Sequence, residues 1–321
     1  MNLQTKIPLK PQQHNPIDYK SEVLLLGSCF VENIGQKLDY FKFKNLQNPF
    51  GILFQPKAIE NLISNAVQEK VYTEDHIFFH NEQWHCFEVH SKLSNSNKDV
   101  LINQLNEQIQ LTVEKLKSVT HIVFTLGTAW VYRNLETEQV VANCHKIPQK
   151  QFSKELLSVD EIVESLKKIV ETVQSINPEV TLLFTVSPIR HLKDGFIENT
   201  QSKAHLITAI HEFLNRQSSI DNRQSFYFAS YELMMDELRD YRFYADDMIH
   251  PNQTAINYIW NAFKMVWISE DVSKTMDAVD EIQKGMQHKP FNPNSEAQLK
   301  FLKKLSEKKA KLHADFPHIS F

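Results

Sequence analysis

The strongest constraint on the fold is a set of short, mostly apolar runs that end at a glycine or a serine. Segments 23–26, 121–126 and 181–186 are runs of this kind, followed by Gly27, Gly127 and Ser187, and 225–228 is a further expected strand. Such runs are typical of strands that are buried on both faces of a sheet. Amphipathic stretches at 101–116 and 159–173 lie between them, so strands alternate with helices. The pattern predicts an α/β fold in three layers, with helices on both faces of a parallel sheet.

Two segments lie outside this alternation. Residues 71–88 are rich in aromatic and histidine side chains around Asn81-Glu82, which predicts a small antiparallel hairpin inserted into the core fold. Residues 252–267 carry apolar side chains at helical spacing, and the chain from Asp271 onward is helical in pattern and rich in Lys and Glu. We therefore expect one domain over residues 1–270 and a helical C-terminal extension over 271–321 that packs on it.

The composition and charge exclude several classes of partner. The 321 residues carry a formal net charge of -4, without the basic surplus that attracts nucleic acid. No segment is apolar for long enough to span a bilayer, and the first residues lack the apolar centre of a signal peptide. We expect a cytoplasmic protein whose partner is a small molecule, with no nucleic acid and no membrane.

Neither a metal nor a cofactor is expected. The three cysteines, Cys29, Cys86 and Cys144, are an odd and widely spaced set, which favours reduced thiols over disulfides or a zinc site. The histidines around the expected hairpin lie on different faces of it and have no carboxylate cluster beside them. The glycine-rich patterns of nucleotide sites are absent as well.

The first candidate for chemistry is Gly27-Ser28-Cys29, at the end of the first expected strand. Reactive groups in a parallel sheet gather at the carboxyl ends of the strands, where N–H groups of the next helix point at the ligand. A glycine permits a sharp turn there, and the first helical turn is expected to lower the pKa of the thiol. A packing or turn role for these small residues is the alternative.

The second candidate is Asp247 with His250, just before the last long amphipathic stretch of the core. A carboxylate three residues before a histidine can orient the imidazole and stabilise its charged form. The histidine is then a competent general base. The alternative is a helix cap at Asp247 beside a solvated His250.

Taken in order along the chain, these blocks resemble a known plan. GSCF at 27–30, GTAW at 127–130 and DxxH at 247–250 are similar to the ordered blocks of the SGNH-hydrolase superfamily, and more closely to its bacterial GSCFA family. The motifs that carry the resemblance also include NPFGILFQP, NCHKIP, TVSPIRHLKDGF and SKAHL. Val31 stands where the family name has alanine. The resemblance implies a parallel-sheet core of SGNH or flavodoxin-like type.

The resemblance also assigns roles to individual residues. The superfamily's first block is Gly-Asp-Ser with serine as the nucleophile, so Cys29 takes the nucleophile's place and Ser28 that of the aspartate. We favour Cys29, because sulfur is the better nucleophile near neutral pH, and keep Ser28 as the alternative. Ala129-Trp130 replaces the usual Asn-Asp of the third block, so the asparagine oxyanion donor is missing. Replacement donors are the N–H groups of Cys29 and Gly51, the hydroxyl of Thr128 and the side chain of Asn143.

Further polar residues are candidates for the pocket. Asn143 and His145 lie in a loop that matches a family motif, and a loop held by its own hydrogen bonds is the alternative. Arg190 and His191 follow the third expected strand and are candidates for an anion-binding rim. Solvated loop charges explain them equally well.

The sequence therefore favours a hydrolase or acyltransferase that acts on an ester or thioester through a covalent acyl-enzyme. Cys29 or Ser28 attacks, His250 moves the proton, and Asp247 orients His250. Water, a sugar or another hydroxyl accepts the acyl group. The alternatives are a catalytically inactive small-molecule binding module that keeps the pocket, and a scaffold whose C-terminal helices dock a partner.

Overall fold

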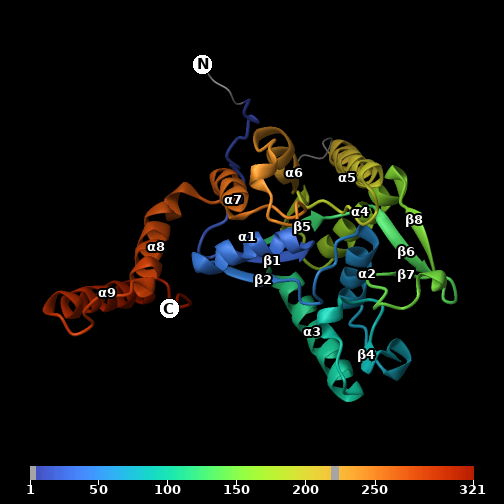
Figure 1. Cartoon of the computed structure of the whole chain (residues 1–321), viewed down its shortest axis with the longest axis horizontal. Helices are drawn as coiled ribbons and strands as arrows, with labels where there is room; N and C mark the ends of the chain where they lie inside the picture. Colours follow the sequence, from blue (N-terminus) through green and yellow to red (C-terminus); the bar gives the residue numbers. More distant parts are fainter. Residues whose placement is uncertain (1–4, 218–223) are drawn as a thin grey trace.

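A five-stranded parallel sheet forms the centre of the molecule. The computed structural model describes residues 5–217 and 224–321, and Figure 1 shows the whole chain. The strands of the sheet are β1 (Glu22–Gly27), β2 (Lys44–Gln47), β5 (His121–Leu126), β9 (Thr181–Val186) and β10 (Ser225–Tyr227). Their spatial order is β10-β9-β5-β1-β2, and every neighbouring pair is parallel. Counted along the chain this is the order 2-1-3-4-5, which is flavodoxin-like.

Helices cover both faces of this sheet, and the two that come last in the chain extend to one side of the body. They are α1 (Cys29–Tyr40), α2 (Pro56–Val67), α3 (Lys98–Ser118), α4 (Val159–Gln174), α5 (Phe196–Gln217), the short α6 (Ser230–Glu232), α7 (Gln253–Trp267), α8 (Ser273–Gln287) and α9 (Glu296–Asp315). Successive strand residues point to opposite faces. Leu24 therefore packs in a core with α2, α3, α4 and α5, while Leu25 packs in a second core with α1, α7 and α8. The predicted three-layer α/β fold is confirmed.

The sequence predicted four of the five strands and missed β2. The missed strand is a short edge strand whose residues Lys44–Gln47 are only half-buried. It has one apolar residue, Leu46, so the sequence contains no apolar run that would predict a strand there. An edge strand pairs on one side only and needs no continuous apolar sequence.

Two small antiparallel sheets are added to the core. The predicted hairpin is present as β3 (Phe78–His80) and β4 (Gln83–His85). Asn81 and Glu82 both have positive φ, at 46° and 61°, as a tight two-residue turn of a hairpin requires. The second sheet has the order β7-β6-β8, from β6 (Trp130–Asn134), β7 (Val140–Val141) and β8 (Phe152–Leu156). The sequence had not predicted this sheet.

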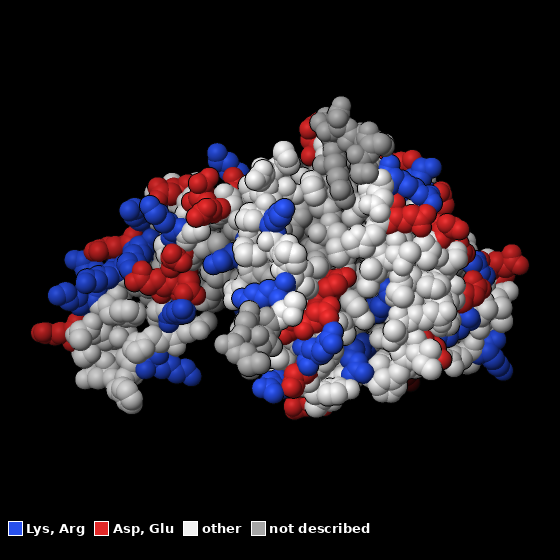
Figure 2. All heavy atoms as spheres, turned by 90° about the horizontal axis from the view of Figure 1, so that it is seen from above, with Lys and Arg blue, Asp and Glu red and all other residues white. Residues whose placement is uncertain are grey.

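The C-terminal helices extend to one side of the body, on the left in Figure 1. α8 buries Met276, Val279 and Ile282 in the same core as α1 and α7. After α9 the chain returns to the body, where the ring of Phe316 lies 5.0 Å from that of Tyr19. Figure 2 shows that acidic and basic side chains are intermixed over this end of the molecule. The division into residues 1–270 and 271–321 stays a prediction.

Candidate active site

The site is built on the sharp turn between β1 and α1, at the carboxyl edge of the sheet. Gly27 has a φ of 141°, and a Cβ at this position would lie 2.2 Å from the carbonyl oxygen of Thr125 in β5. The same carbonyl accepts a hydrogen bond from the N–H of Ser28 at 2.9 Å. Only glycine lets the two strands approach this closely, and the turn then presents Cys29 as the first residue of α1.

A second loop, just before α7, presents a histidine and a carboxylate. One oxygen of Asp247 accepts the backbone N–H groups of Ile249 and His250, at 2.9 and 3.0 Å. The other lies 2.6 Å from Nδ1 of His250. These hydrogen bonds, with that from the His250 backbone the largest, lower the pKa of Asp247 to about 2. The carboxylate therefore stays ionised and fixes the ring so that Nε2 faces away from it.

Nε2 of His250 lies 3.7 Å from Sγ of Cys29, across 221 positions of sequence. The contact joins two motifs that lie far apart in the sequence, GSCF and DxxH. Cys29, His250 and Asp247 thus form a continuous thiol, imidazole and carboxylate series. This order is the geometry of a nucleophile, a general base and the group that orients the base.

The expectation that the helix start lowers the pKa of Cys29 is not met. Burial raises the pKa of this thiol, and the negative charge of Glu32, one turn along α1, raises it further. The backbone N–H groups of Cys29 and Phe30 and the charge of Lys203 act in the opposite direction and are outweighed. Deprotonation of Cys29 consequently depends on the base beside it.

Ser28 occupies a different environment from Cys29. Its side chain is 2% exposed, and Oγ accepts the N–H of Phe30 at 3.3 Å as the N-cap of α1. A serine at this position satisfies one of the unpaired N–H groups at the start of a helix. Of the two candidate nucleophiles, Cys29 is the one that contacts His250.

Two of the expected oxyanion donors are engaged within the fold. The N–H of Gly51 donates to the carbonyl of Asn48 at 2.7 Å. The hydroxyl of Thr128 is 2.9 Å from that of Ser202 and accepts the N–H of Trp130 at 3.1 Å. Both facts count against Gly51 and Thr128 as oxyanion donors. The N–H of Cys29 donates to no backbone carbonyl in residues 5–217 and 224–321, and it lies close enough to its own thiol to lower the pKa of that group.

Asn143 and His145 lie in the loop after β7. The side-chain oxygen of Asn143 accepts the N–H of His145 at 2.8 Å, and Nε2 of His145 is 2.7 Å from the carbonyl oxygen of Cys86. Burial lowers the pKa of His145 to about 4. None of these contacts involves Cys29 or His250, and a role of Asn143 and His145 in the pocket stays a prediction.

Arg190 and His191 lie beside the loop that presents His250. Nη1 of Arg190 donates to the carbonyl of Met248 at 3.1 Å, and its guanidinium lies over three aromatic rings, those of Phe196, Tyr241 and Tyr244. His191 is packed against Phe54, with ring centroids 5.5 Å apart. Burial and then the positive charges of Lys203 and His250 lower the pKa of His191 to about 3. A neutral His191 offers no charge to an anion, so Arg190 alone remains a candidate for that role.

Comparison with protein families decides what kind of chain this is. A model described as the GSCFA family matches residues 22–263, and one described as the C-terminal domain of GSCFA domain proteins matches residues 279–321. The chain belongs to the GSCFA family. The first match contains every candidate site residue, from Ser28 to His250. No curated protein matches the chain significantly in sequence.

Distant similarity to solved structures is also found. The GSCFA chain is similar to a carbohydrate esterase family 3 protein from Talaromyces cellulolyticus, at 10% identity and a TM-score of 0.37, covering 81% of this chain and 99% of that one. It is also similar to an acetyl esterase variant with an acetate ion, at 11% identity and a TM-score of 0.37, covering 81% of this chain and 99% of that one. A third similar structure is an acetyl xylan esterase from the rumen bacterium Butyrivibrio proteoclasticus, at 8% identity and a TM-score of 0.38, covering 85% of this chain and 66% of that one. These likenesses are too distant to assign an activity.

Sequence reasoning missed two residues that hold the site of the GSCFA chain together. The side-chain oxygen of Asn48 accepts the N–H of Gly27 at 2.9 Å and so fixes the turn before Cys29. Lys203 in α5 is 1% exposed and donates to two backbone carbonyls at the same edge of the sheet. Both residues lie in motifs that the resemblance included, NPFG and SKAHL, and that pattern was the available signal.

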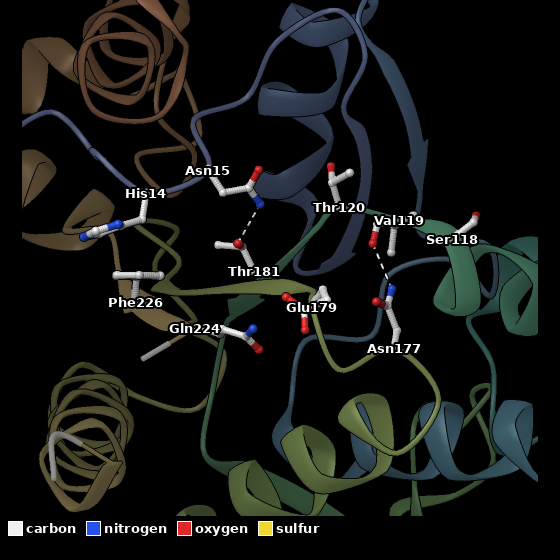
Figure 3. A pocket seen from close by; sticks show the side chains of 10 residues that line it. All are labelled: His14, Asn15, Ser118, Val119, Thr120, Asn177, Glu179, Thr181, Gln224 and Phe226. Carbon is white, nitrogen blue, oxygen red and sulfur yellow. Dashed lines mark hydrogen bonds between the residues drawn. The ribbon is translucent and has the colours of Figure 1, made fainter. Parts of the chain in front are cut away.

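Two cavities bear on where the chemistry takes place, and neither is lined by Cys29. One of about 340 Å³ is lined by Phe54, Gln55, Trp130 and Asn143, among others, near the carboxyl end of β5. The other, of about 860 Å³, lies at the opposite edge of the sheet, where β5 and β9 begin (Figure 3). Several of its polar side chains are paired within the fold, as in the hydrogen bonds from Asn15 to Thr181 at 2.8 Å and from Asn177 to the carbonyl of Val119 at 2.9 Å. The carboxyl edge is therefore the better candidate for chemistry.

In residues 5–217 and 224–321, no helix is both long and apolar enough to cross a membrane.

Proposed function

We propose that this GSCFA protein is a hydrolase or acyltransferase that acts on a small-molecule ester or thioester through an acyl-enzyme at Cys29. One observation carries the proposal. Sγ of Cys29 lies 3.7 Å from Nε2 of His250, and Nδ1 of the same ring lies 2.6 Å from Asp247. Packing alone does not require an ionised carboxylate, an imidazole and a thiol in this order.

The reaction runs in two halves. His250 Nε2 takes the proton of the Cys29 thiol, and the thiolate attacks the carbonyl carbon of the substrate. The tetrahedral intermediate collapses, the bond to the leaving oxygen or sulfur breaks, and the leaving group takes the proton from His250. The acyl group is then a thioester of Cys29. Water or a hydroxyl, such as that of a sugar, gives its proton to His250, attacks the thioester and releases the Cys29 thiol.

The raised pKa of Cys29 gives His250 a definite part in the first half. A thiol that is protonated at neutral pH needs a base in contact with it, and His250 is in that position. Asp247 stabilises the imidazolium that forms. The N–H of Cys29, at the start of α1, is the donor that we assign to the oxyanion, because it lies beside the attacking sulfur and points out of the helix end.

Trapping of the acyl-enzyme tests the proposal directly. The purified chain is incubated with short activated acyl esters and thioesters and quenched in acid, and the added mass is located by intact-protein and peptide mass spectrometry. We expect one acyl group on Cys29 in the wild type and none in His250→Ala. Cys144→Ala is the matched control, because Cys144 is also a half-buried thiol with a raised pKa, and its loss should leave the adduct unchanged.

The location of the adduct also decides between the two nucleophiles. An adduct on Ser28, or one that persists in full in His250→Ala, would sink the mechanism written here. Folding of each variant is checked by circular dichroism, so that a lost adduct is not mistaken for a lost fold.

A catalytically inactive binding module is the second candidate function. Two observations favour it: the donors of Gly51 and Thr128 are engaged within the fold, and the Cys29 thiol has a raised pKa. Under this reading no donor gives an adduct in any variant. Binding of the same esters, measured by calorimetry, then survives the change of Cys29 to alanine.

A further inference from the structure

An arginine lies beside the loop that presents His250. Nη1 of Arg190 donates to the carbonyl of Met248 at 3.1 Å, and the backbone N–H of Arg190 donates to that of Ile249 at 3.3 Å. Met248 comes two positions before His250, so their Cα atoms are at most about 7 Å apart. A group bound to this guanidinium would therefore lie on the order of 10 Å from the imidazole, which is close enough for both to contact one substrate.

Most N–H groups of this guanidinium have no partner in the part of the chain that the structure describes. A guanidinium has five N–H groups, and the bond to Met248 is the one side-chain hydrogen bond found for Arg190 in residues 5–217 and 224–321. The other arginines in these ranges each pair with a carboxylate: Arg133, Arg216, Arg239 and Arg242. Asp247, the carboxylate of the neighbouring loop, has both oxygens bonded within that loop. The charge of Arg190 is therefore available to a ligand.

Aromatic rings surround the guanidinium and are themselves exposed. Its central carbon lies 5.5 Å from the ring centroid of Phe196, 5.8 Å from that of Tyr241 and 5.5 Å from that of Tyr244. Phe196 and Tyr241 are 66% and 63% exposed, and Ile197 is 78% exposed. Single exposed apolar residues are common, but a group of them around one cation is typical of a surface that binds a ligand. The rings also orient the guanidinium, so it is prepared to bind an anion.

We propose that Arg190, with the exposed side chains of Phe196 and Tyr241, forms a subsite for an anionic acyl donor: an ester or thioester that carries a carboxylate a few bonds from its reacting carbonyl. The inference rests on the proposed function in that this carbonyl reacts at Cys29. The guanidinium pairs with the carboxylate through parallel N–H donors. The apolar part of the donor covers the aromatic side chains.

The test compares donors that differ in one charge. Mono(4-nitrophenyl) adipate carries a carboxylate at the end of its acyl chain, and methyl 4-nitrophenyl adipate masks that carboxylate. The kcat/KM of each is measured from the release of 4-nitrophenolate in the wild type and in Arg190→Met, with Cys29→Ala as the blank. We expect the wild type to prefer the charged donor and the variant to lose about ten-fold of that preference, with kcat/KM for the methyl ester unchanged.

A second pair of donors places the charge on the leaving group. These are 3-carboxyphenyl butyrate and its methyl ester, and their cleavage is followed by chromatography. A preference for the charged donor in either pair that is lost in Arg190→Met supports the inference and tells which half of the donor carries the carboxylate. A wild type without this preference in both pairs would overturn it.

The methyl esters report on the other role of Arg190, which is its hydrogen bond to the loop of His250. If this bond alone mattered, Arg190→Met would slow the charged and the masked donors equally. An equal loss would therefore show that Arg190 only holds the loop, and the inference would be wrong.

Arg242→Met is the matched control, since it removes the same charge from the protein. Arg242 lies in the same turn as Tyr241, but its guanidinium pairs with Asp240 at 3.0 Å. We expect it to leave the preference for the charged donor unchanged. A loss equal to that of Arg190→Met would mean that the net charge of the protein attracts the donor, which contradicts a subsite at Arg190.

A second measurement leaves Arg190 in place, in case Arg190→Met does not fold. The binding of mono(4-nitrophenyl) adipate and of its methyl ester to Cys29→Ala is measured by calorimetry at low and at high salt. We expect the charged donor to bind about ten-fold more tightly at low salt, with a smaller advantage at high salt, where an exposed charge pair is screened. Equal affinities would overturn the inference, while acyl transfer at Cys29 would still stand. Conversely, a chain that forms no acyl adduct but prefers the charged donor keeps the inference without the proposed function.

Discussion

Replacement of Gly27 by alanine should disrupt both the sheet and the site. The added Cβ would lie 2.2 Å from the carbonyl oxygen of Thr125 and 2.8 Å from its carbonyl carbon, and both are backbone atoms of the central strand β5. A backbone atom in the middle of a sheet does not move aside as a flexible side chain does. The strands must therefore separate, which also weakens the hydrogen bond from the N–H of Ser28 to the same carbonyl.

The magnitude follows from three contributions. A φ of 141° is strained for any residue with a Cβ, by about 1–3 kcal/mol. Overpacking in a dense core costs about 1–3 kcal/mol, and a weakened backbone hydrogen bond about 1 kcal/mol. We expect the free energy of unfolding of Gly27→Ala to fall by about 3–7 kcal/mol, which is a large part of the stability of a typical domain.

Urea unfolding followed by circular dichroism measures this change, with Gly35→Ala as the control. Gly35 lies inside α1, and the atoms nearest to a Cβ there belong to the side chain of Gln47 rather than to the backbone. This side chain can turn away at the cost of its hydrogen bonds to Asp39 and Asn45. Alanine also favours the helix by about 1 kcal/mol, so we expect Gly35→Ala to stay within about 1 kcal/mol of the wild type. A Gly27→Ala protein of wild-type stability would refute the close-approach argument for the turn.

Three further changes test the charges and the packing around the site. Glu32→Gln should increase the rate at which iodoacetamide alkylates Cys29 at pH 7 by roughly several-fold, because it removes a negative charge that opposes the thiolate. A slower rate would contradict this expectation. The wild type should be more stable than Asp247→Asn above about pH 4, which is the usual pKa of a carboxyl in an unfolded chain. This difference in stability should disappear as the pH falls through about 2, the pKa of Asp247 in the fold. Urea unfolding at several pH values measures it. A difference that does not change with pH would show that the carboxylate is not stabilised in the fold. Gln55→Leu should raise the free energy of unfolding by about 1–2 kcal/mol, because the amide of this 2% exposed side chain has no partner in the described part of the chain, and a loss of stability would show that the amide is needed.

The central strands of the fold were predictable because a strand that is buried on both faces has a mostly apolar sequence without alternation. β5 and β9 are buried at every position, so each is an apolar run without alternation. β2 and the sheet of β6, β7 and β8 are half-buried and short, and their sequences carry no such run. Their pairing depends on neighbours that are distant in sequence, which a local pattern does not report.

The contact of Cys29 with His250 was predicted from the order of motifs, but the availability of hydrogen-bond donors was not. Whether the N–H of Gly51 or the hydroxyl of Thr128 is free depends on which acceptor lies within 3 Å in the folded chain. Asn48 supplies the acceptor for Gly51, within a turn of four residues. The hydroxyl of Thr128 is hydrogen-bonded to that of Ser202, which is 74 positions away in the sequence. A motif gives the residue type at a position, but it does not tell which residue will be its hydrogen-bond partner in the fold.

The pKa of the thiol is the property that the sequence misjudged most, and the reason is physical. A helix start acts on Cys29 through the local backbone, and that contribution is visible in the sequence. Burial and the charges of Glu32 and Lys203 act through space, and Lys203 is 174 positions away from Cys29. Because these charges have opposite signs, the thiolate population depends on their difference and on the base that contacts the sulfur. Glu32→Gln should therefore move the alkylation midpoint of Cys29 to lower pH, and an unmoved or raised midpoint would refute the electrostatic account of this site.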